Sequence, residues 1–179
     1  YRDLGAVDQT RRDHDVAALA RRLAERGVRF TQIFLRSWDQ HSRLPTNIKL
    51  MAEDSDQPTY ALVTDLKRRG LLDDTVVIWG GEFGRTPMSQ GNKGTVGRDH
   101  HNKSMSMWLA GGGVKGGTEV GTTDEWGYRV AENPVTGYDV HATVLALLGV
   151  DHTSLTFRHN GVNRRLTDVH GVVQTKILA

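Results

Sequence analysis

The spacing of apolar residues along the first third of the chain predicts a helix followed by a strand. Apolar side chains recur at helical intervals between Val16 and Leu23, which predicts a helix over residues 16–26. Asp15 is the expected N-cap of this helix, and a glycine follows its end. Residues 28–37 then carry the β-branched and aromatic side chains that are typical of a strand.

A second helix–strand unit follows after a polar stretch, residues 39–55, that we expect to be irregular. Asp56 is the expected N-cap of the second helix, and Pro58 falls in the first turn, where a missing N–H is tolerated. The helix is expected to end at Gly70. Residues 75–79 are continuously apolar, which favours a strand that is buried on both faces in the centre of a parallel sheet.

The rest of the chain continues the alternation of strands and helices. We expect a functional or disordered loop over residues 80–103, a strand over 104–110, a hairpin or irregular excursion over 114–137, and a helix over 139–148. Short mixed elements should follow, with a last strand or helix over 172–178. The alternation predicts a single α/β domain over residues 1–179, with a mostly parallel sheet flanked by helices.

Composition and charge narrow the classes of function. Of the 179 residues, 37% are hydrophobic and 25% are charged, which is typical of a globular protein, and no apolar run is long enough for a membrane span. The net charge is only +2 and the arginines are spread along the chain, so we expect no nucleic-acid partner. Because the chain has no cysteine, disulfides and thiolate metal sites are excluded.

Three polar clusters carry the residue types from which catalytic and metal sites are built: residues 38–41, 81–87 and 97–101. Ligand sites of open α/β sheets form outside the carboxyl ends of the strands, and the first two clusters directly follow predicted strands. Asp39 and His41 are two residues apart, so on an extended backbone their side chains point to the same side. A carboxylate and an imidazole together suit a divalent metal, although a turn with solvated side chains would give the same pattern.

The other two clusters add candidates of the same kind. Glu82 and Arg85 lie among glycines that allow close approach of a ligand, and Arg85 could pair with a phosphate or sulfate oxygen. A surface turn is the alternative interpretation of that cluster. Asp99, His100 and His101 form the densest group of ligand types, but two adjacent histidines on an extended backbone point apart. One of them could bind a metal while the other packs or donates a hydrogen bond.

Taken together and in this order, these clusters resemble an uncharacterised, sulfatase-like family of exported bacterial proteins, a branch of the alkaline phosphatase/sulfatase superfamily. The resemblance covers nearly the whole chain past residue 16. It is carried by residues 20–30, Trp38-Asp39-x-His41, residues 65–74, 81–87, 97–101 and 108–117, Asp139-x-His141-Ala142-Thr143, and residues 147–149 and 166–171.

The resemblance implies the C-terminal half of an alkaline phosphatase-like fold, and thus a fragment that lacks the N-terminal, nucleophile-bearing part. It implies a divalent metal (zinc, manganese, magnesium or calcium) held by Asp39, His41, Glu82 and His100, with no organic cofactor. Phe83 stands where the superfamily has a histidine, so one metal site would be reduced or absent. The family's export signals imply a periplasmic or exported protein.

These observations lead to one functional hypothesis and two rivals. The resemblance implies a metal-dependent hydrolase of small-molecule or glycan sulfate or phosphate esters. Within it, Arg85 would offset charge on the transferred group, and Asp99 would orient a ligating histidine. The rivals are a non-catalytic relative that binds sulfated or phosphorylated glycans, and a structural surface protein. The oligomeric state, and the choice between sulfate and phosphate, stay open at this point.

Overall fold

The computed structural model describes residues 9–179, with side chains described from Val16 onward. This part of the chain divides into two compact units. Unit 1 comprises residues 9–72 and 85–100, and unit 2 comprises residues 73–84 and 101–179. Within residues 9–179, no helix is both long and apolar enough to cross a membrane.

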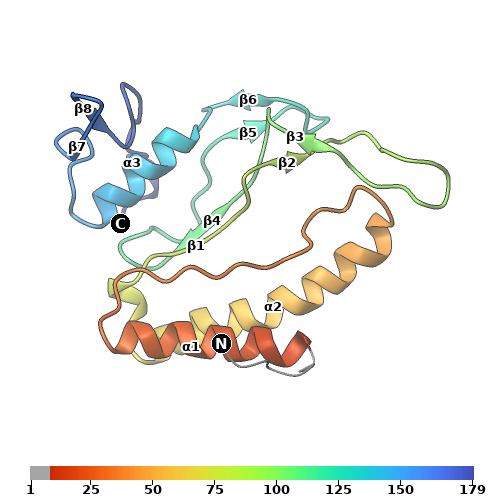
Figure 1. The fold of residues 1–179 in the computed structure, drawn as a ribbon, viewed down its shortest axis with the longest axis horizontal. Helices are drawn as coiled ribbons and strands as arrows, with labels where there is room; N and C mark the ends of the chain where they lie inside the picture. Colours follow the sequence, from red (N-terminus) through yellow and green to blue (C-terminus); the bar gives the residue numbers. More distant parts are fainter. Residues whose placement is uncertain (1–8) are drawn as a thin grey trace. The chain divides into compact units, whose positions relative to one another are not determined.

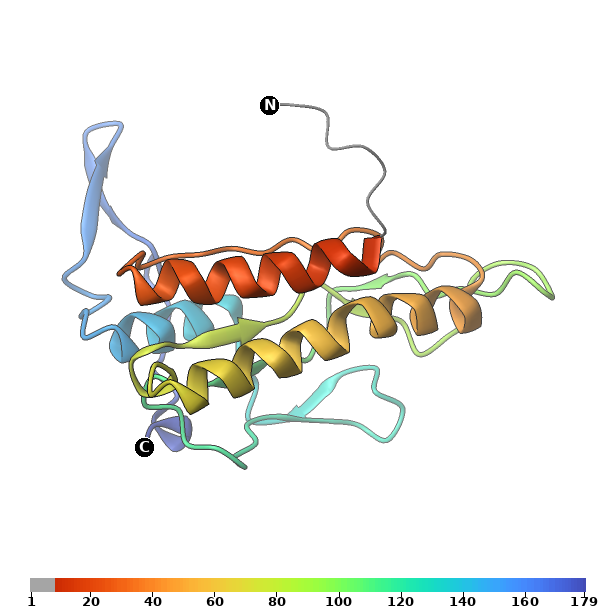
Figure 2. The ribbon, with the colours of Figure 1, turned by 90° about the horizontal axis from the view of Figure 1, so that it is seen from below.

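Unit 1 is built on two long helices, α1 (Gln9–Glu25) and α2 (Leu44–Arg68). The helices lie side by side and run in the same direction, because the segment between them returns along their length (Figures 1 and 2). Both begin earlier than we predicted, so Asp15 is not a cap but lies inside α1, and Pro58 lies inside α2. The early start of α2 was missed because its first half is polar, and a polar helix face has the composition of an irregular loop.

The contact between α1 and α2 combines small buried residues with a ring of four charges. Ala17 and Ala20 of α1 and Leu66 of α2 are buried. Beside them, Arg21 pairs with Glu25 at 2.5 Å and with Asp65 at 2.9 Å. Arg69 closes the ring on the same two carboxylates, at 2.8 Å from Glu25 and 2.9 Å from Asp65. The ring joins the end of α1 to the end of α2.

The segment between the helices is extended but forms no strand, so the predicted strand over residues 28–37 is wrong. No hydrogen bond described for residues 9–179 involves the backbone of residues 29–36. Its aromatic side chains are open to solvent, with Phe30 80% and Phe34 77% exposed. The sequence has the composition of a strand, but a strand also needs a pairing partner, and this segment has none among residues 9–179.

Unit 2 contains the strand pair β1 (Val77–Trp79) and β4 (Trp108–Ala110). Both strands were predicted, but they are short and antiparallel, with Val77 opposite Ala110. The cross-strand pair Trp79 and Trp108 stacks with ring centroids 6.4 Å apart and planes 3° from parallel. Ile78 on the other face is 44% exposed, so the expectation of a central strand buried on both faces is wrong.

The remaining strands are equally short. β2 (Gly84–Arg85) pairs with β3 (His100–His101). β5 (Thr122–Thr123) and β6 (Val130–Glu132) form an antiparallel pair, so the hairpin predicted within residues 114–137 is confirmed. β7 (Thr156–His159) and β8 (Val162–Arg165) form a second hairpin. Two short 3-10 helices, Leu72–Asp74 and Thr175–Ile177, complete the elements.

The predicted fold class is therefore wrong for the described part of the chain. Residues 9–179 form three α-helices and two-stranded sheets, and the β1–β4, β5–β6 and β7–β8 pairs are antiparallel. A mostly parallel sheet flanked by helices, as in the C-terminal half of an alkaline phosphatase-like fold, is not what they form. The alternation of apolar segments was correct, but alternation does not determine which strands pair.

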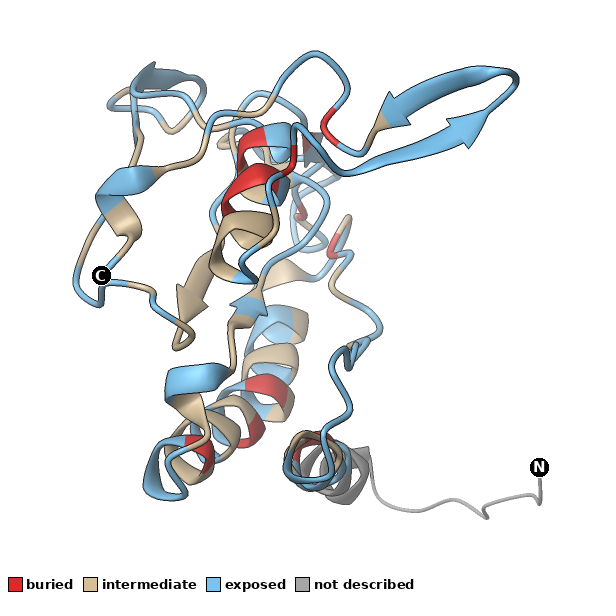
Figure 3. Cartoon of the chain, turned by 90° about the vertical axis from the view of Figure 1, so that its left-hand side faces the viewer, coloured by how far each residue is buried: buried red, intermediate tan, exposed pale blue. Residues whose placement is uncertain are grey.

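Helix α3 (Gly137–Leu147) confirms the helix predicted over residues 139–148 and anchors the end of the chain. Thr136 and Asp139 form a capping box at its start, in which each side chain accepts a hydrogen bond from the other's backbone N–H. The second oxygen of Asp139 accepts the N–H of Val172 at 2.7 Å. Many of the buried residues of the described chain lie on its helices (Figure 3).

Candidate metal centre

The candidate site begins at the turn that residues 37–43 of unit 1 form. Ser37 and Arg43 bracket it with φ angles of 70° and 50°, the left-handed region that non-glycine residues rarely adopt. Gln40 is buried and donates its side-chain amide to the carbonyl of Ser37 at 2.5 Å. These constraints hold the backbone of Asp39 and His41 in a bend instead of the extended conformation that we expected. Strained backbone of this kind clusters at functional sites.

A loop of the same unit, residues 86–100, packs its backbone onto this turn. Arg98 donates its N–H to the carbonyl of Gln40 at 3.1 Å, and Leu44 donates to the carbonyl of Val96 at 2.9 Å. At Gly97 the two backbones are so close that a Cβ would overlap the carbonyl of His41. Residue 97 must therefore be a glycine for the loop to reach the turn.

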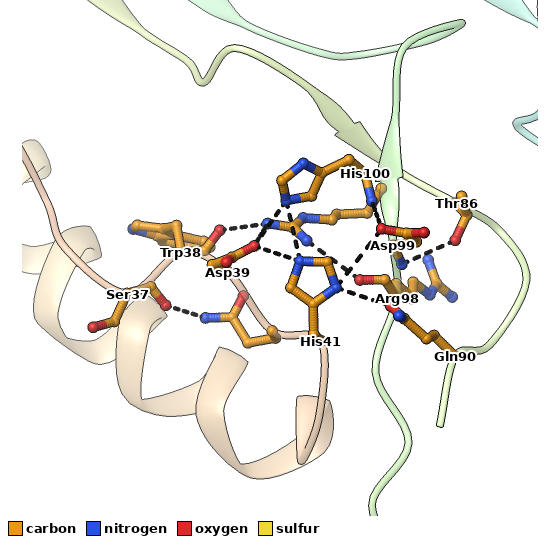
Figure 4. A network of polar contacts seen from close by, with 11 residues as sticks. Ser37, Trp38, Asp39, His41, Thr86, Gln90, Arg98, Asp99 and His100 are labelled. Atoms are coloured by element: carbon orange, nitrogen blue, oxygen red, sulfur yellow. Dashed lines mark hydrogen bonds and ion pairs between the residues drawn. The ribbon is translucent and has the colours of Figure 1, made fainter. Parts of the chain in front are cut away.

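Asp39, His41 and His100 converge where the turn and the loop meet (Figure 4). Oδ1 of Asp39 lies 2.9 Å from Nε2 of His41 and 2.9 Å from Nε2 of His100. The two Nε2 atoms are 3.1 Å apart. The three side chains are partly open to solvent, with exposed fractions of 59%, 37% and 43% in the order Asp39, His41 and His100.

Oδ1 of Asp39, Nε2 of His41 and Nε2 of His100 form a triangle whose size can be compared with a metal coordination shell. Zinc bound at about 2.0–2.1 Å by nitrogen and oxygen places neighbouring tetrahedral ligands roughly 3.3 Å apart. The three edges at Asp39, His41 and His100, 2.9 to 3.1 Å, are a few tenths of an ångström shorter. One carboxylate oxygen and two imidazole nitrogens are also a donor set that zinc or manganese accepts. The three residues therefore fit one face of a tetrahedral shell, whose fourth position would stay open to solvent.

Arg85 is held against this triangle and is not free to receive a ligand. Its guanidinium donates to Oδ1 of Asp39 at 2.6 Å and to the carbonyl of Trp38 at 2.9 Å. A third hydrogen bond reaches the carbonyl of Arg98 at 3.3 Å. Arg85 therefore fixes the carboxylate of Asp39 and ties the turn to the loop.

The electrostatics of the site follow from these contacts. The hydrogen bond from Arg85, the hydrogen bond from His100 and the charge of His41 lower the pKa of Asp39 from 3.8 to about 2. Asp39 therefore stays ionised across the whole range in which proteins are usually folded. An ionised carboxylate is the form that a divalent cation binds.

The other predicted site residues are placed as follows. Asp99 accepts the backbone N–H of His100 at 2.8 Å, and its Oδ1 is 3.7 Å from Nδ1 of His41, which is too far for a hydrogen bond. His101, in unit 2, is buried and bonds through Nε2 to the carbonyl of Tyr128 at 2.7 Å. Glu82 belongs to unit 2 and is not one of the three clustered ligands.

Sequence reasoning missed one residue of the site, Gln90. Its side-chain Oε1 lies 2.9 Å from Nδ1 of His41, on the ring edge opposite the triangle. A single glutamine in a loop of glycines and small polar residues carries no sequence signal for such a role. Only the folding of the loop onto the turn brings it to His41, 49 positions away.

Comparison with known proteins gives a family but no activity. Residues 3–178 match the model of a family described as "Protein of unknown function (DUF1501)". No curated protein matches the chain significantly. No solved structure does so either.

Proposed function

This chain belongs to the DUF1501 family, whose description names no activity, and we propose that the intact protein is a divalent-metal-dependent hydrolase of sulfate or phosphate esters. The observation that carries the proposal is the convergence of Asp39, His41 and His100, whose ligand atoms all lie within 4.8 Å of one another. The substrate class comes from the resemblance of the sequence to sulfatase-like proteins.

The hydrogen bonds of the triangle support a cation at its centre. Nδ1 of His41 lies 2.9 Å from Oε1 of Gln90, and when the neutral ring donates its Nδ1–H to this oxygen, Nε2 carries a lone pair. That lone pair faces the ionised oxygen of Asp39 at 2.9 Å, and two electron-rich atoms repel each other at that distance. Either a proton, such as the one that His100 donates to Asp39, or a metal ion between the three atoms removes this repulsion.

Each residue then has a defined task. Asp39, His41 and His100 would hold the metal, which would supply Lewis acidity toward the oxygens of a tetrahedral ester group and would lower the pKa of a bound water. Arg85 keeps Asp39 ionised and oriented. Because Arg85 is committed to Asp39 and to backbone carbonyls, we assign it this positioning role in place of direct contact with substrate.

A second candidate function, binding of sulfated or phosphorylated glycans without turnover, is favoured by one observation. Thr86 is a hydroxyl residue that contacts Asp99, the neighbour of His100 in the chain, and a hydroxyl is a candidate nucleophile. However, Thr86 donates to the carbonyl of Met88 at 2.9 Å and accepts the N–H of Asp99 at 3.2 Å. With its hydroxyl used in this way, Thr86 holds the loop and is not available for attack.

Both candidate functions assume a metal ion held by Asp39, His41 and His100, and metal binding by the purified chain tests this assumption. Titration calorimetry with Zn²⁺ and with Mn²⁺ should give one site per chain. His41→Ala and His100→Ala should weaken it by more than the roughly 10–100-fold that is typical of losing an outer-shell partner. His159→Ala, in the exposed hairpin strand β7, is the matched control and should leave the affinity unchanged. A chain that binds neither ion overturns the proposal.

Turnover separates the two functions. Aryl sulfates and aryl phosphates should be hydrolysed by the metal-loaded intact protein, and hydrolysis should stop on chelation and in His41→Ala. Metal binding together with saturable binding of a sulfated or phosphorylated glycan, but without hydrolysis, would replace the hydrolase with the binding function.

A further inference from the structure

The orientation of His41 depends on a residue that lies outside the candidate ligand set. An imidazole binds a metal through a nitrogen that carries a lone pair, and the hydrogen bond at the other nitrogen decides which one that is. In His41 the nitrogen that faces Asp39 and His100 is Nε2. The opposite nitrogen, Nδ1, lies 2.9 Å from Oε1 of Gln90.

We propose that Gln90 is a positioning residue, which holds His41 in the tautomer that has its proton on Nδ1 and its lone pair on Nε2. An amide oxygen only accepts hydrogen bonds, so the proton between Gln90 and His41 belongs to His41. The alternative acceptor, Oδ1 of Asp99, is 3.7 Å from the same nitrogen. Gln90 therefore takes the orienting role that the sequence suggested for Asp99.

The backbone of the loop fixes the position of Gln90. Gln90 donates its N–H to the carbonyl of Gly97 at 2.8 Å, and Gly97 donates back to the carbonyl of Gln90 at 2.7 Å. Gly97 is the residue that packs against the carbonyl of His41. The same glycine thus positions the loop against the turn and places the side chain of Gln90 at the outer edge of the His41 ring (Figure 4).

Without the acceptor oxygen of Gln90, the tautomer of His41 that has its proton on Nε2 becomes more populated. A proton on Nε2 of His41 would donate to Oδ1 of Asp39, which is 2.9 Å away and ionised. That hydrogen bond would occupy Nε2 of His41 and Oδ1 of Asp39, the two atoms that would otherwise bind the metal. Gln90 thereby keeps the site open in the metal-free protein, and the value of this for metal binding rests on the proposed function above.

Three substitutions at position 90 separate the chemistry of the side chain from its bulk, and all three leave the backbone pair with Gly97 in place. Gln90→Met keeps the length but has no strong acceptor, Gln90→Glu keeps an acceptor oxygen, and Gln90→Lys offers only donors. Gln57→Met, on the exposed side of helix α2, is the matched control.

The first measurement is made on the metal-free protein. Long-range ¹H–¹⁵N spectra at about pH 8, where an ordinary histidine is neutral, identify the tautomer, and His41→Ala assigns the signals. The wild type, Gln90→Glu and Gln57→Met should show the Nδ1–H form, and Gln90→Met and Gln90→Lys should show the Nε2–H form. An unchanged Nδ1–H form in Gln90→Met overturns the proposal, whether or not the chain binds a metal.

The second measurement is the affinity for Zn²⁺. The affinity should fall roughly 10–100-fold in Gln90→Met, which is the range for losing an outer-shell partner of a ligating histidine. It should recover in Gln90→Glu. An equal loss in Gln90→Met and Gln90→Glu would overturn the link between tautomer and affinity. A wild-type chain without zinc affinity would instead contradict the proposed function, while the spectra would still decide the role of Gln90.

Discussion

At the scale of single residues, the site depends on one oxygen atom. Oδ1 of Asp39 is within hydrogen-bonding distance of Arg85, His41 and His100 at the same time. These partners stabilise the charged form of the carboxylate, which is why its pKa falls to about 2. The arginine contributes the largest part of this effect.

Replacing Arg85 should therefore raise the pKa of Asp39. In Arg85→Met the side chain keeps its length but loses its charge and donors, so the pKa of Asp39 should move from about 2 toward 3.8. It should not reach 3.8, because His100 and His41 remain. Titration of the Asp39 carboxyl signal by ¹³C NMR measures the shift. Arg68→Met, at the exposed end of helix α2, should not change it, and an unchanged pKa in Arg85→Met would contradict the assignment of Arg85.

At the scale of elements, the extended segment between α1 and α2 is a weakly stabilised part of unit 1. Residues 29–36 make none of the backbone hydrogen bonds described for residues 9–179, whereas the helices on either side satisfy theirs internally. Backbone groups without partners depend on water, and the largely exposed side chains of Phe30 and Phe34 add little packing. The segment is fixed mainly by its two ends.

Amide hydrogen exchange should reveal this difference. Amides of residues 29–36 should exchange within roughly tenfold of the rate of an unstructured peptide, since local opening there has almost no free-energy cost. Amides in the middle of helix α2 provide the internal reference and should be protected far more strongly. Protection of residues 29–36 at the level of α2 would mean that the segment has found a strand partner, contrary to the structure.

Helices α2 and α3 and the segment between α1 and α2 show how far the sequence could predict the fold. Helix α3 was predicted because its signals are local: an apolar face and a glycine after its end. The segment 28–37 was predicted wrongly because pairing is not local, and neither composition nor alternation says whether a partner exists. Helix α2 was half missed because its packing against α1, and not its polar first half, makes it a helix.

The site was predictable to a different degree. Asp39, His41 and His100 are residue types that bind metals and that lie in the polar clusters 38–41 and 97–101, so the sequence could nominate them. Their distances depend on the left-handed turn at Ser37 and on the close approach at Gly97, which no local pattern encodes. For the same reason, the sequence suggested Asp99 as the residue that orients a ligating histidine, and the structure places Gln90 closer to His41 than Asp99.

At the scale of the whole molecule, both units rely on carboxylates that are more acidic when the chain is folded. In unit 1, hydrogen bonds from Arg69 lower the pKa of Asp65, as those from Arg85 do for Asp39. In unit 2, burial alone would raise the pKa of Asp139, but hydrogen bonds from Thr136 and Val172 outweigh it and lower the pKa. Hydrogen bonds from Ser154 and Thr153 lower the pKa of Asp151 to about 2.

These shifts set the direction in which stability depends on pH. A carboxylate whose pKa is lower in the folded state binds fewer protons there than in the unfolded chain, so acid favours unfolding. Its contribution is complete well above the unfolded value of 3.8 and is lost as the pH falls through the folded value. For Asp39 and Asp151 that window runs from 3.8 down to about 2.

The free energy of unfolding should thus fall steeply between about pH 4 and pH 2, in both units. Urea unfolding, followed by circular dichroism at several pH values, measures the slope. Asp39→Asn and Asp151→Asn remove one titrating group from unit 1 and one from unit 2, so each should lower stability near neutral pH and flatten the fall in acid. Asp73→Asn, at an aspartate in the 3-10 helix Leu72–Asp74, is the control and should leave the slope unchanged. A wild-type slope in both Asp39→Asn and Asp151→Asn would show that other groups control the acid response.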